Sequence, residues 1–111
     1  MSNTQILLKD SNYRLLTNPS FLPDFKHIFA TDLLSTAIKH IKNETALITL
    51  IVSQTTLSLA LMLDLEVLIV TKDAVVNEAF IMKANEQGLC VIYANYLTHE
   101  VIKDIYQRGI L

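Results

Sequence analysis

Three short apolar runs constrain the fold more than any other feature of this sequence. They span residues 46–52, 67–71 and 89–93, and they read ALITLIV, VLIVT and LCVIY. Each run is rich in β-branched residues and nearly continuously apolar, which is typical of strands covered on both faces. The runs begin 21 and 22 residues apart, which leaves room for a helix of about ten residues and two tight loops. This pattern predicts a parallel sheet whose strands are joined by right-handed crossover helices.

Four helices are predicted from apolar spacing and end signals. The first follows residue 30, with Thr31 or Asp32 as its N-cap. Its apolar stripe consists of Leu33, Leu34, Ala37, Ile38 and Ile41. The second, residues 54–63, follows Ser53 as N-cap and is apolar on nearly every side, so we expect it to contact two neighbours. Residues 77–87 and 98–108 form the others, and they end at Gly88 and Gly109, as helices often do.

The sequence before the first helix predicts two further strands. Residues 13–17 read as an edge strand, a turn surrounds Pro19 and Pro23, and residues 27–30 form a short strand. We therefore expect one α/β domain over residues 1–111, with three layers and a mostly parallel sheet of four to five strands. Crossover helices cover both faces of that sheet. Residues 1–26 supply an N-terminal edge strand and loop, and residues 27–111 supply repeated β-α units.

Composition excludes several classes of protein. The chain has 111 residues and a net charge of −2, which fits a single domain and gives no basic field for a nucleic acid partner. One cysteine, Cys90, permits no intrachain disulfide and favours a cytoplasmic location. Residues 45–63 carry no charge, but the polar cluster at residues 53–56 argues against a membrane span. Residues 1–5 lack the features of a secretory signal.

Motifs for catalysis are missing from the sequence. Its two glycines both follow predicted helices, which excludes a phosphate-binding P-loop and a dinucleotide-binding turn. The three histidines, His27, His40 and His99, share no metal-ligand spacing with one another or with Cys90. Because Cys90 lies in an apolar strand, we expect a thiol with a raised pKa and no nucleophilic role. We therefore expect no catalytic residue, no metal and no cofactor, with an enzyme that uses Asp32, Ser53 or His99 left as an alternative.

Polar residues gather where the predicted parallel strands end. In such sheets, ligands bind beyond the carboxyl ends of the strands, near helix N-termini. One cation, Lys72, stands at this edge. We predict a site for a small anionic metabolite or a nucleotide that is formed by Thr31, Asp32, Ser53, Gln54, Thr55, Thr71, Lys72, Asp73 and Thr98. The alternative is that Thr31, Ser53, Asp73 and Thr98 are helix caps and that Lys72 is solvated.

The apolar content suggests an interface. Six residues at strand and helix spacing are expected in the core: Met62, Phe80, Met82, Tyr93, Tyr96 and Tyr106. The apolar helix at residues 54–63 and the apolar end at residues 109–111 leave more apolar surface than a small monomer covers, so we expect a homodimer. The alternative is an interaction subunit that docks a protein partner there and has no small-molecule ligand.

Several segments together resemble the DRTGG-type domain, a family that is also similar to the N-terminal domain of HPr kinase/phosphorylase. The segments are TDLLS at 31–35, the strand-helix-strand stretch at 46–71, ANEQG at 84–88, and YLTHE at 96–100 with residues 106–111. The resemblance covers residues 28–111 and rests on their order and spacing. It implies a small stand-alone bacterial member of the family: a regulatory, ligand-sensing α/β module in which dimerisation recurs.

The sequence departs from the family pattern at three places. Lys72 and Asp73 stand where the glycine pair that names the family falls, Cys90 replaces a proline, and His99 replaces an aromatic residue. The phosphate loop of the kinase has no counterpart in this sequence. The resemblance therefore implies a regulatory role without phosphoryl transfer.

Overall fold

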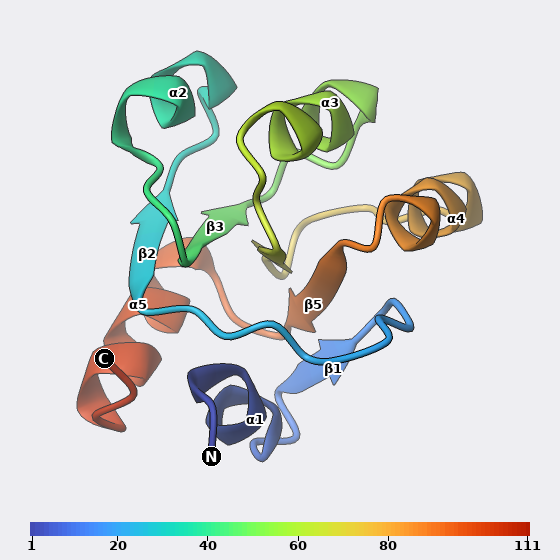
Figure 1. Ribbon diagram of the computed structural model, residues 1–111. Helices are drawn as coiled ribbons and strands as arrows, with labels where there is room; N and C mark the ends of the chain where they lie inside the picture. The colour runs from blue at the N-terminus through green and yellow to red at the C-terminus, as the bar shows by residue number, and fades with distance from the viewer.

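The computed structural model describes residues 1–111, which form one five-stranded sheet between two layers of helices (Figure 1). The strand order is β1-β5-β4-β3-β2, with β1 antiparallel to β5 and the other four strands parallel. The strands are β1 (Tyr13–Leu15), β2 (His27–Ala30), β3 (Thr45–Thr49), β4 (Val67–Val70) and β5 (Cys90–Ala94). The predicted three-layer fold with a mostly parallel sheet is confirmed.

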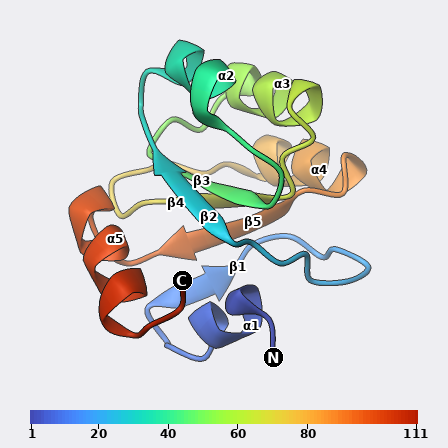
Figure 2. The ribbon, with the colours of Figure 1, turned by 60° about the vertical axis from the view of Figure 1, so that its left-hand side comes forward.

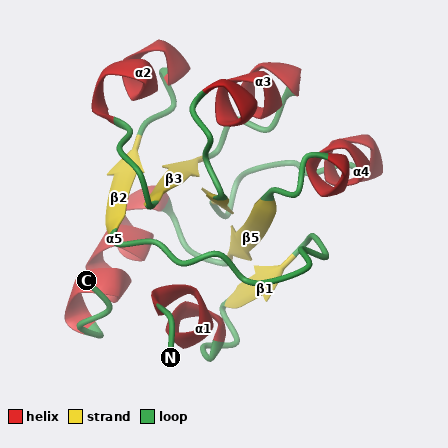
Figure 3. Ribbon diagram, viewed as in Figure 1, coloured by secondary structure: helices red, strands yellow, loops and turns green.

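The helices divide unequally between the two faces of the sheet (Figure 2). One layer contains the 3₁₀ turn Leu34–Thr36, α2 (Ala37–His40), α3 (Gln54–Met62) and α4 (Glu78–Glu86). The other contains only α1 (Asn3–Leu8) and α5 (Thr98–Gln107). Since β2, β3, β4 and β5 are neighbours in sequence order, each connection between them crosses the same face (Figure 3).

Two apolar cores explain why the strand sequences are continuously apolar. Along β4, Val67 and Ile69 belong to the core beneath α1 and α5, whereas Leu68 and Val70 belong to the core beneath α2, α3 and α4. All residues of β3 and β4 are buried. Because alternate side chains of a strand point to opposite faces, a strand between two cores needs apolar residues at every position.

The helix α1 was missed by the sequence analysis, which assigned residues 1–26 to a strand and a loop. It begins with a capping box: the Ser2 hydroxyl accepts the Gln5 N–H at 3.1 Å, and the Gln5 side chain accepts the Ser2 N–H at 2.8 Å. Leu7 is fully buried in the core beneath α1 and α5. The Ser-x-x-Gln signal was present in the sequence, but six residues are too few to show a helical period.

Arg108 joins this N-terminal helix to the C-terminal one. Its guanidinium donates to the Asp104 carboxylate at 3.0 and 3.1 Å, and to the backbone carbonyls of Ile6 and Leu7 at 3.1 and 3.4 Å. The Tyr13 hydroxyl donates to the same carboxylate at 2.7 Å, and burial, followed by this bond, raises the pKa of Tyr13. One side chain thus satisfies carbonyls at the C-terminal end of α1 and links α1, β1 and α5.

The first predicted helix is shorter than expected, and neither predicted N-cap holds its start. The Thr31 hydroxyl accepts the Leu33 N–H at 3.1 Å, and Asp32 bonds to the end of β3. Because Thr31 forms this local turn, regular helix begins later, and no side chain caps the 3₁₀ turn. The expected apolar stripe is only partly buried: Ala37 lies in the core, but Leu33 and Ile38 are 64% and 53% exposed.

Two of the caps in the alternative reading of the candidate site are not formed. Asp73 lies in the turn after β4, and the side chain of Asn77 instead accepts the Phe80 N–H at the start of α4. Thr98 is the first residue of α5, so Leu97 occupies the N-cap position. The strand predicted at residues 46–52 ends at Thr49, and residues 50–52 lead into α3.

The expected burial of six aromatic and methionine side chains holds only in part. Phe80 is buried, and Tyr93 and Tyr96 are half-buried. Met62, Met82 and Tyr106 were wrongly placed in the core, since they are 61%, 63% and 61% exposed. They lie on outward faces of α3, α4 and α5, which have no further layer of the chain to cover them. None of the helices combines the length and the apolar character needed to cross a membrane.

We expect Arg108→Ala to lower the free energy of unfolding by about 2 kcal/mol, because Asp104 and two carbonyls of α1 lose a charged donor. Urea denaturation measures this change. Lys103→Ala is the matched control, since Lys103 is exposed on the same helix and its loss should cost less than about 0.5 kcal/mol. Equal costs in the two variants would contradict the role assigned to Arg108.

Candidate functional site

The carboxyl edge of the parallel strands carries most of the residues predicted to bind a ligand. Asp32 has a structural role at this edge, because its carboxylate accepts hydrogen bonds from the Thr49 hydroxyl and the Leu50 N–H, both at 2.9 Å. Asp32 thus ties the loop after β2 to the loop after β3. Thr31 is occupied by the turn to Leu33 and by a hydroxyl contact of 3.0 Å with Thr36.

Ser53 and Gln54 line a small cavity of about 170 Å³ between the N-terminal ends of α3 and α4. Lys83 of α4 also lines it, and its ammonium donates to the Gln54 side-chain oxygen at 3.1 Å. The Ser53 hydroxyl does not cap α3, so the first-turn N–H groups of α3 lack a side-chain acceptor from the N-cap. This end of α3 therefore combines a positive helix terminus with a nearby cation, while Thr55 is exposed in the same turn.

Sequence reasoning missed Lys83 and Asn77, which line the same cavity. The other residues were predicted because they follow the carboxyl ends of parallel strands. Lys83 lies in the second turn of a helix, so that criterion does not select it. Only the packing of α4 beside α3 brings its ammonium to the carboxyl edge.

A second part of this edge lies over β4 and β5. The Lys72 N–H donates to the Tyr96 carbonyl at 2.9 Å, and the Tyr93 hydroxyl donates to the Lys72 carbonyl at 3.1 Å. These bonds fasten the loop after β4 to the loop after β5. Thr71 is buried, and its carbonyl accepts the Ala74 N–H at 2.9 Å. The side chains of Lys72 and Asp73 remain exposed.

The chain changes faces between these two neighbouring strands. The helix after β4 is α4, on one face, and the helix after β5 is α5, on the other (Figure 2). Ligands of open α/β sheets bind at such a switch point, and Lys72 stands in the loop beside it. Thr98 begins α5, which covers the face of the sheet opposite to α4. At this helix start the Glu100 carboxylate already accepts the Leu97 N–H at 2.8 Å. That carboxylate makes the start of α5 a poorer anion site than the start of α3.

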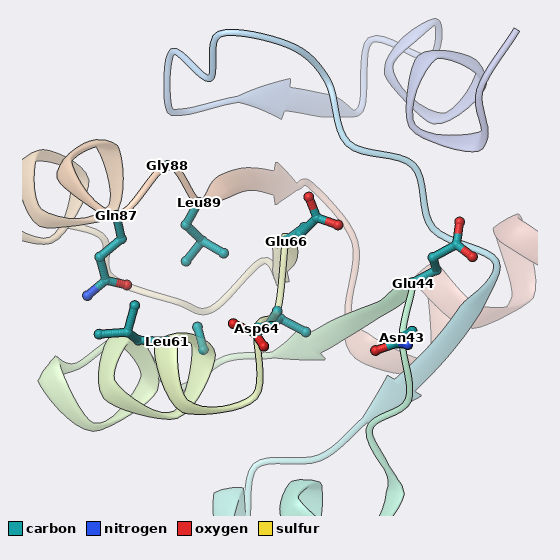
Figure 4. A pocket seen from close by; sticks show the side chains of 10 residues that line it. Asn43, Glu44, Leu61, Asp64, Glu66, Gln87, Gly88 and Leu89 are labelled. Carbon is teal, nitrogen blue, oxygen red and sulfur yellow. The ribbon is translucent and has the colours of Figure 1, made fainter.

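The opposite, amino edge of the sheet is acidic. A pocket of about 400 Å³ opens there between helix ends and strand starts, and the carboxylates of Glu44, Asp64 and Glu66 line it (Figure 4). Asp64 and Gly88 have φ of 53° and 72° and follow the C-caps of α3 and α4, so helix termination accounts for their left-handed backbone. Its charge makes this pocket unsuited to the predicted anionic ligand.

Cys90 lies fully buried in β5. Burial raises the pKa of its thiol to about 11, so the thiol stays neutral, and hence weakly nucleophilic, near neutral pH.

Comparison with known proteins identifies one informative fold neighbour. No protein-family model matches the chain, and no curated protein matches it. Among solved structures, it is similar to the crystal structure of the CBS and DRTGG domains of the regulatory region of Clostridium perfringens pyrophosphatase, complexed with the activator diadenosine tetraphosphate. The TM-score is 0.69 at 15% sequence identity, over 95% of this chain and 45% of that one. The chain shares the fold of the part of that structure that it matches. It spans less than half the length of that structure, and the expected link to HPr kinase stays a prediction.

The thiol of Cys90 predicts a loss of stability in alkali. An unfolded thiol ionises near pH 9.0 and the folded one near 11, so the stabilisation is complete below pH 9 and disappears as the pH rises through 11. Between pH 9 and 10 we expect the free energy of unfolding to fall by about 1 kcal/mol. Urea denaturation of wild type and Cys90→Ala measures this; the same slope in both proteins would rule out Cys90 as the cause.

Proposed function

We propose that this chain is a non-catalytic regulatory module of the DRTGG type that senses a small anionic metabolite or a nucleotide. One observation carries the proposal: the chain shares its fold, over 95% of its length, with part of a regulatory region that was crystallised with a nucleotide activator. The order of the TDLLS, ANEQG and YLTHE segments supports the DRTGG assignment.

The ligand site in this proposal is the carboxyl edge of the sheet. Lys83 bonds to a neutral amide oxygen, and Lys72 forms no ion pair, since the structure contains only the Arg108–Asp104 salt bridge. Both ammonium groups therefore keep a positive charge available to phosphate or carboxylate groups. The uncapped N-terminus of α3 adds N–H donors at the same edge.

The absence of catalysis in this proposal rests on how the reactive side chains are used. Asp32 accepts two bonds from the end of β3. The side chains of Ser53 and His99 form no hydrogen bond with Asp32 or with each other, so no triad is assembled. Cys90 is buried and protonated near neutral pH.

A homodimer is part of the proposal. Leu61 and Met62 of α3 and Met82 of α4 are 61–63% exposed on the outer side of the same helical layer. Burial of these side chains against a second copy would remove apolar surface from water. The same exposed side chains favour the second candidate function, an interaction subunit that binds another protein and no small ligand.

The test is thermal denaturation with ATP, ADP, diadenosine tetraphosphate and inorganic phosphate. A ligand present at about 100 times its Kd should raise the melting temperature by about 4 to 8 °C. We expect Lys72→Ala and Lys83→Ala to reduce that rise, whereas Lys39→Ala, an exposed cation of α2, should leave it unchanged. Size-exclusion chromatography of the same samples should give a dimer.

Other outcomes select the alternatives. No rise with any compound, together with a stoichiometric protein partner, would favour the interaction subunit. A turnover that disappears on substitution of Asp32, Ser53 or His99 would make the chain an enzyme.

A further inference from the structure

The free edge of the sheet at β2 carries a cavity of about 410 Å³ whose charged lining residues are basic. In Figures 1 and 2, β2 is the last strand of the sheet, with α2 on one side and α5 on the other. Two of the nine lysine and arginine residues and two of the three histidines line the cavity: Lys26, His27, His40 and Lys42. No acidic side chain is part of its lining.

The lysines of this groove have no carboxylate partner, because the molecule contains only the Arg108–Asp104 salt bridge. Two acids, Asp24 and Glu44, each lie two residues from one of these lysines along the chain. The Asp24 carboxylate accepts the N–H groups of Asn3 and Phe25 at 2.7 and 2.9 Å. Glu44 contributes its backbone carbonyl, which accepts the N–H groups of Lys26 and His27 at 2.7 and 3.1 Å. Its carboxylate lines the acidic pocket at the amino edge instead (Figure 4). Uncompensated cations in a concave site attract anions more strongly than the same cations on a convex surface.

Aromatic and imidazole rings line the cavity beside these cations. The imidazole of His40 stacks on Phe29, with ring centroids 5.0 Å apart and planes at 25°, and His40 is itself exposed. From the α5 side, Tyr106 lines the same cavity and is 61% exposed. Lysines bind phosphate as point charges, and aromatic faces stack on nucleobases. The volume lies within the range of small-molecule sites.

We infer that the β2 groove, lined by Lys26, His27, Phe29, His40, Lys42 and Tyr106, is a nucleotide site separate from the carboxyl edge. Lys26 and Lys42 neutralise the phosphates, and the base stacks on the free face of His40. This site does not depend on the proposed function, because it shares no residue with the carboxyl-edge site.

The test is isothermal titration of ATP and GTP into the whole chain, with adenosine as the ligand that lacks phosphate. We expect at least one nucleotide to bind, adenosine to bind far more weakly, and the Lys26→Gln/Lys42→Gln variant to lose about tenfold in affinity. Raising the salt should weaken nucleotide binding to wild type. Lys39→Ala is the matched control on α2 and should bind as wild type does. An unchanged melting temperature shows that the double variant is folded.

Two results with the wild type and the double variant would overturn the inference, and a third, with the carboxyl-edge variants, would also do so. One is no binding of either nucleotide at millimolar concentration. The other is equal affinity in wild type and the double variant, which would mean that the lysines serve only to oppose pairing of the free strand edge with another chain. Loss of binding only in Lys72→Ala or Lys83→Ala would place the ligand at the carboxyl edge and also refute the groove. Loss only in the groove variant would support the groove and remove the nucleotide from the proposed carboxyl-edge site.

Discussion

Burial of the central strands on both faces is the constraint on which the rest of this structure depends. β3, β4 and β5 send alternate side chains into two cores, so each face of the sheet must be covered by helices. The crossover connections supply one layer as a consequence of sequential strand order. The other layer has only α5 and the six-residue α1, which come from opposite ends of the chain. Arg108 holds these two helices together by satisfying the carbonyls at the end of α1 and the carboxylate of Asp104.

Much of this architecture can be predicted from the sequence because two-sided burial leaves a plain signal. The runs VLIVT and LCVIY are almost entirely apolar, whereas a strand with one face in solvent would alternate apolar and polar residues. Gly88 and Gly109 mark the ends of the helices that follow these runs. Such patterns do not predict which of several possible hydrogen bonds a polar side chain forms. Thr31 and Asp32 have side chains suited to cap a helix, yet they bond to a turn and to the end of β3. Met62 and Met82 have core-like spacing, but nothing in this chain covers them.

The candidate sites show the same limit of prediction from sequence for individual side chains. The carboxyl edge could be predicted because strand direction alone determines which loops meet there, and Ser53, Gln54 and Lys72 do lie on those loops. Lys83 reaches that edge only through the packing of α4 beside α3. The β2 groove draws Lys26 from the start of β2, His40 and Lys42 from the end of α2, and Tyr106 from the far end of the chain. No spacing in the sequence links these three segments, so only the folded chain reveals the groove.

In the proposed function, the carboxyl edge of the sheet, and not the acidic amino edge, binds the ligand. The most direct measurement is an amide chemical-shift titration of the ¹⁵N-labelled chain with diadenosine tetraphosphate. The proposed function predicts that the largest shifts fall in the first turn of α3 and in the loop that carries Lys72. Shifts confined to the acidic pocket of Glu44, Asp64 and Glu66 or to the β2 groove, or no shifts at saturating nucleotide, would contradict it.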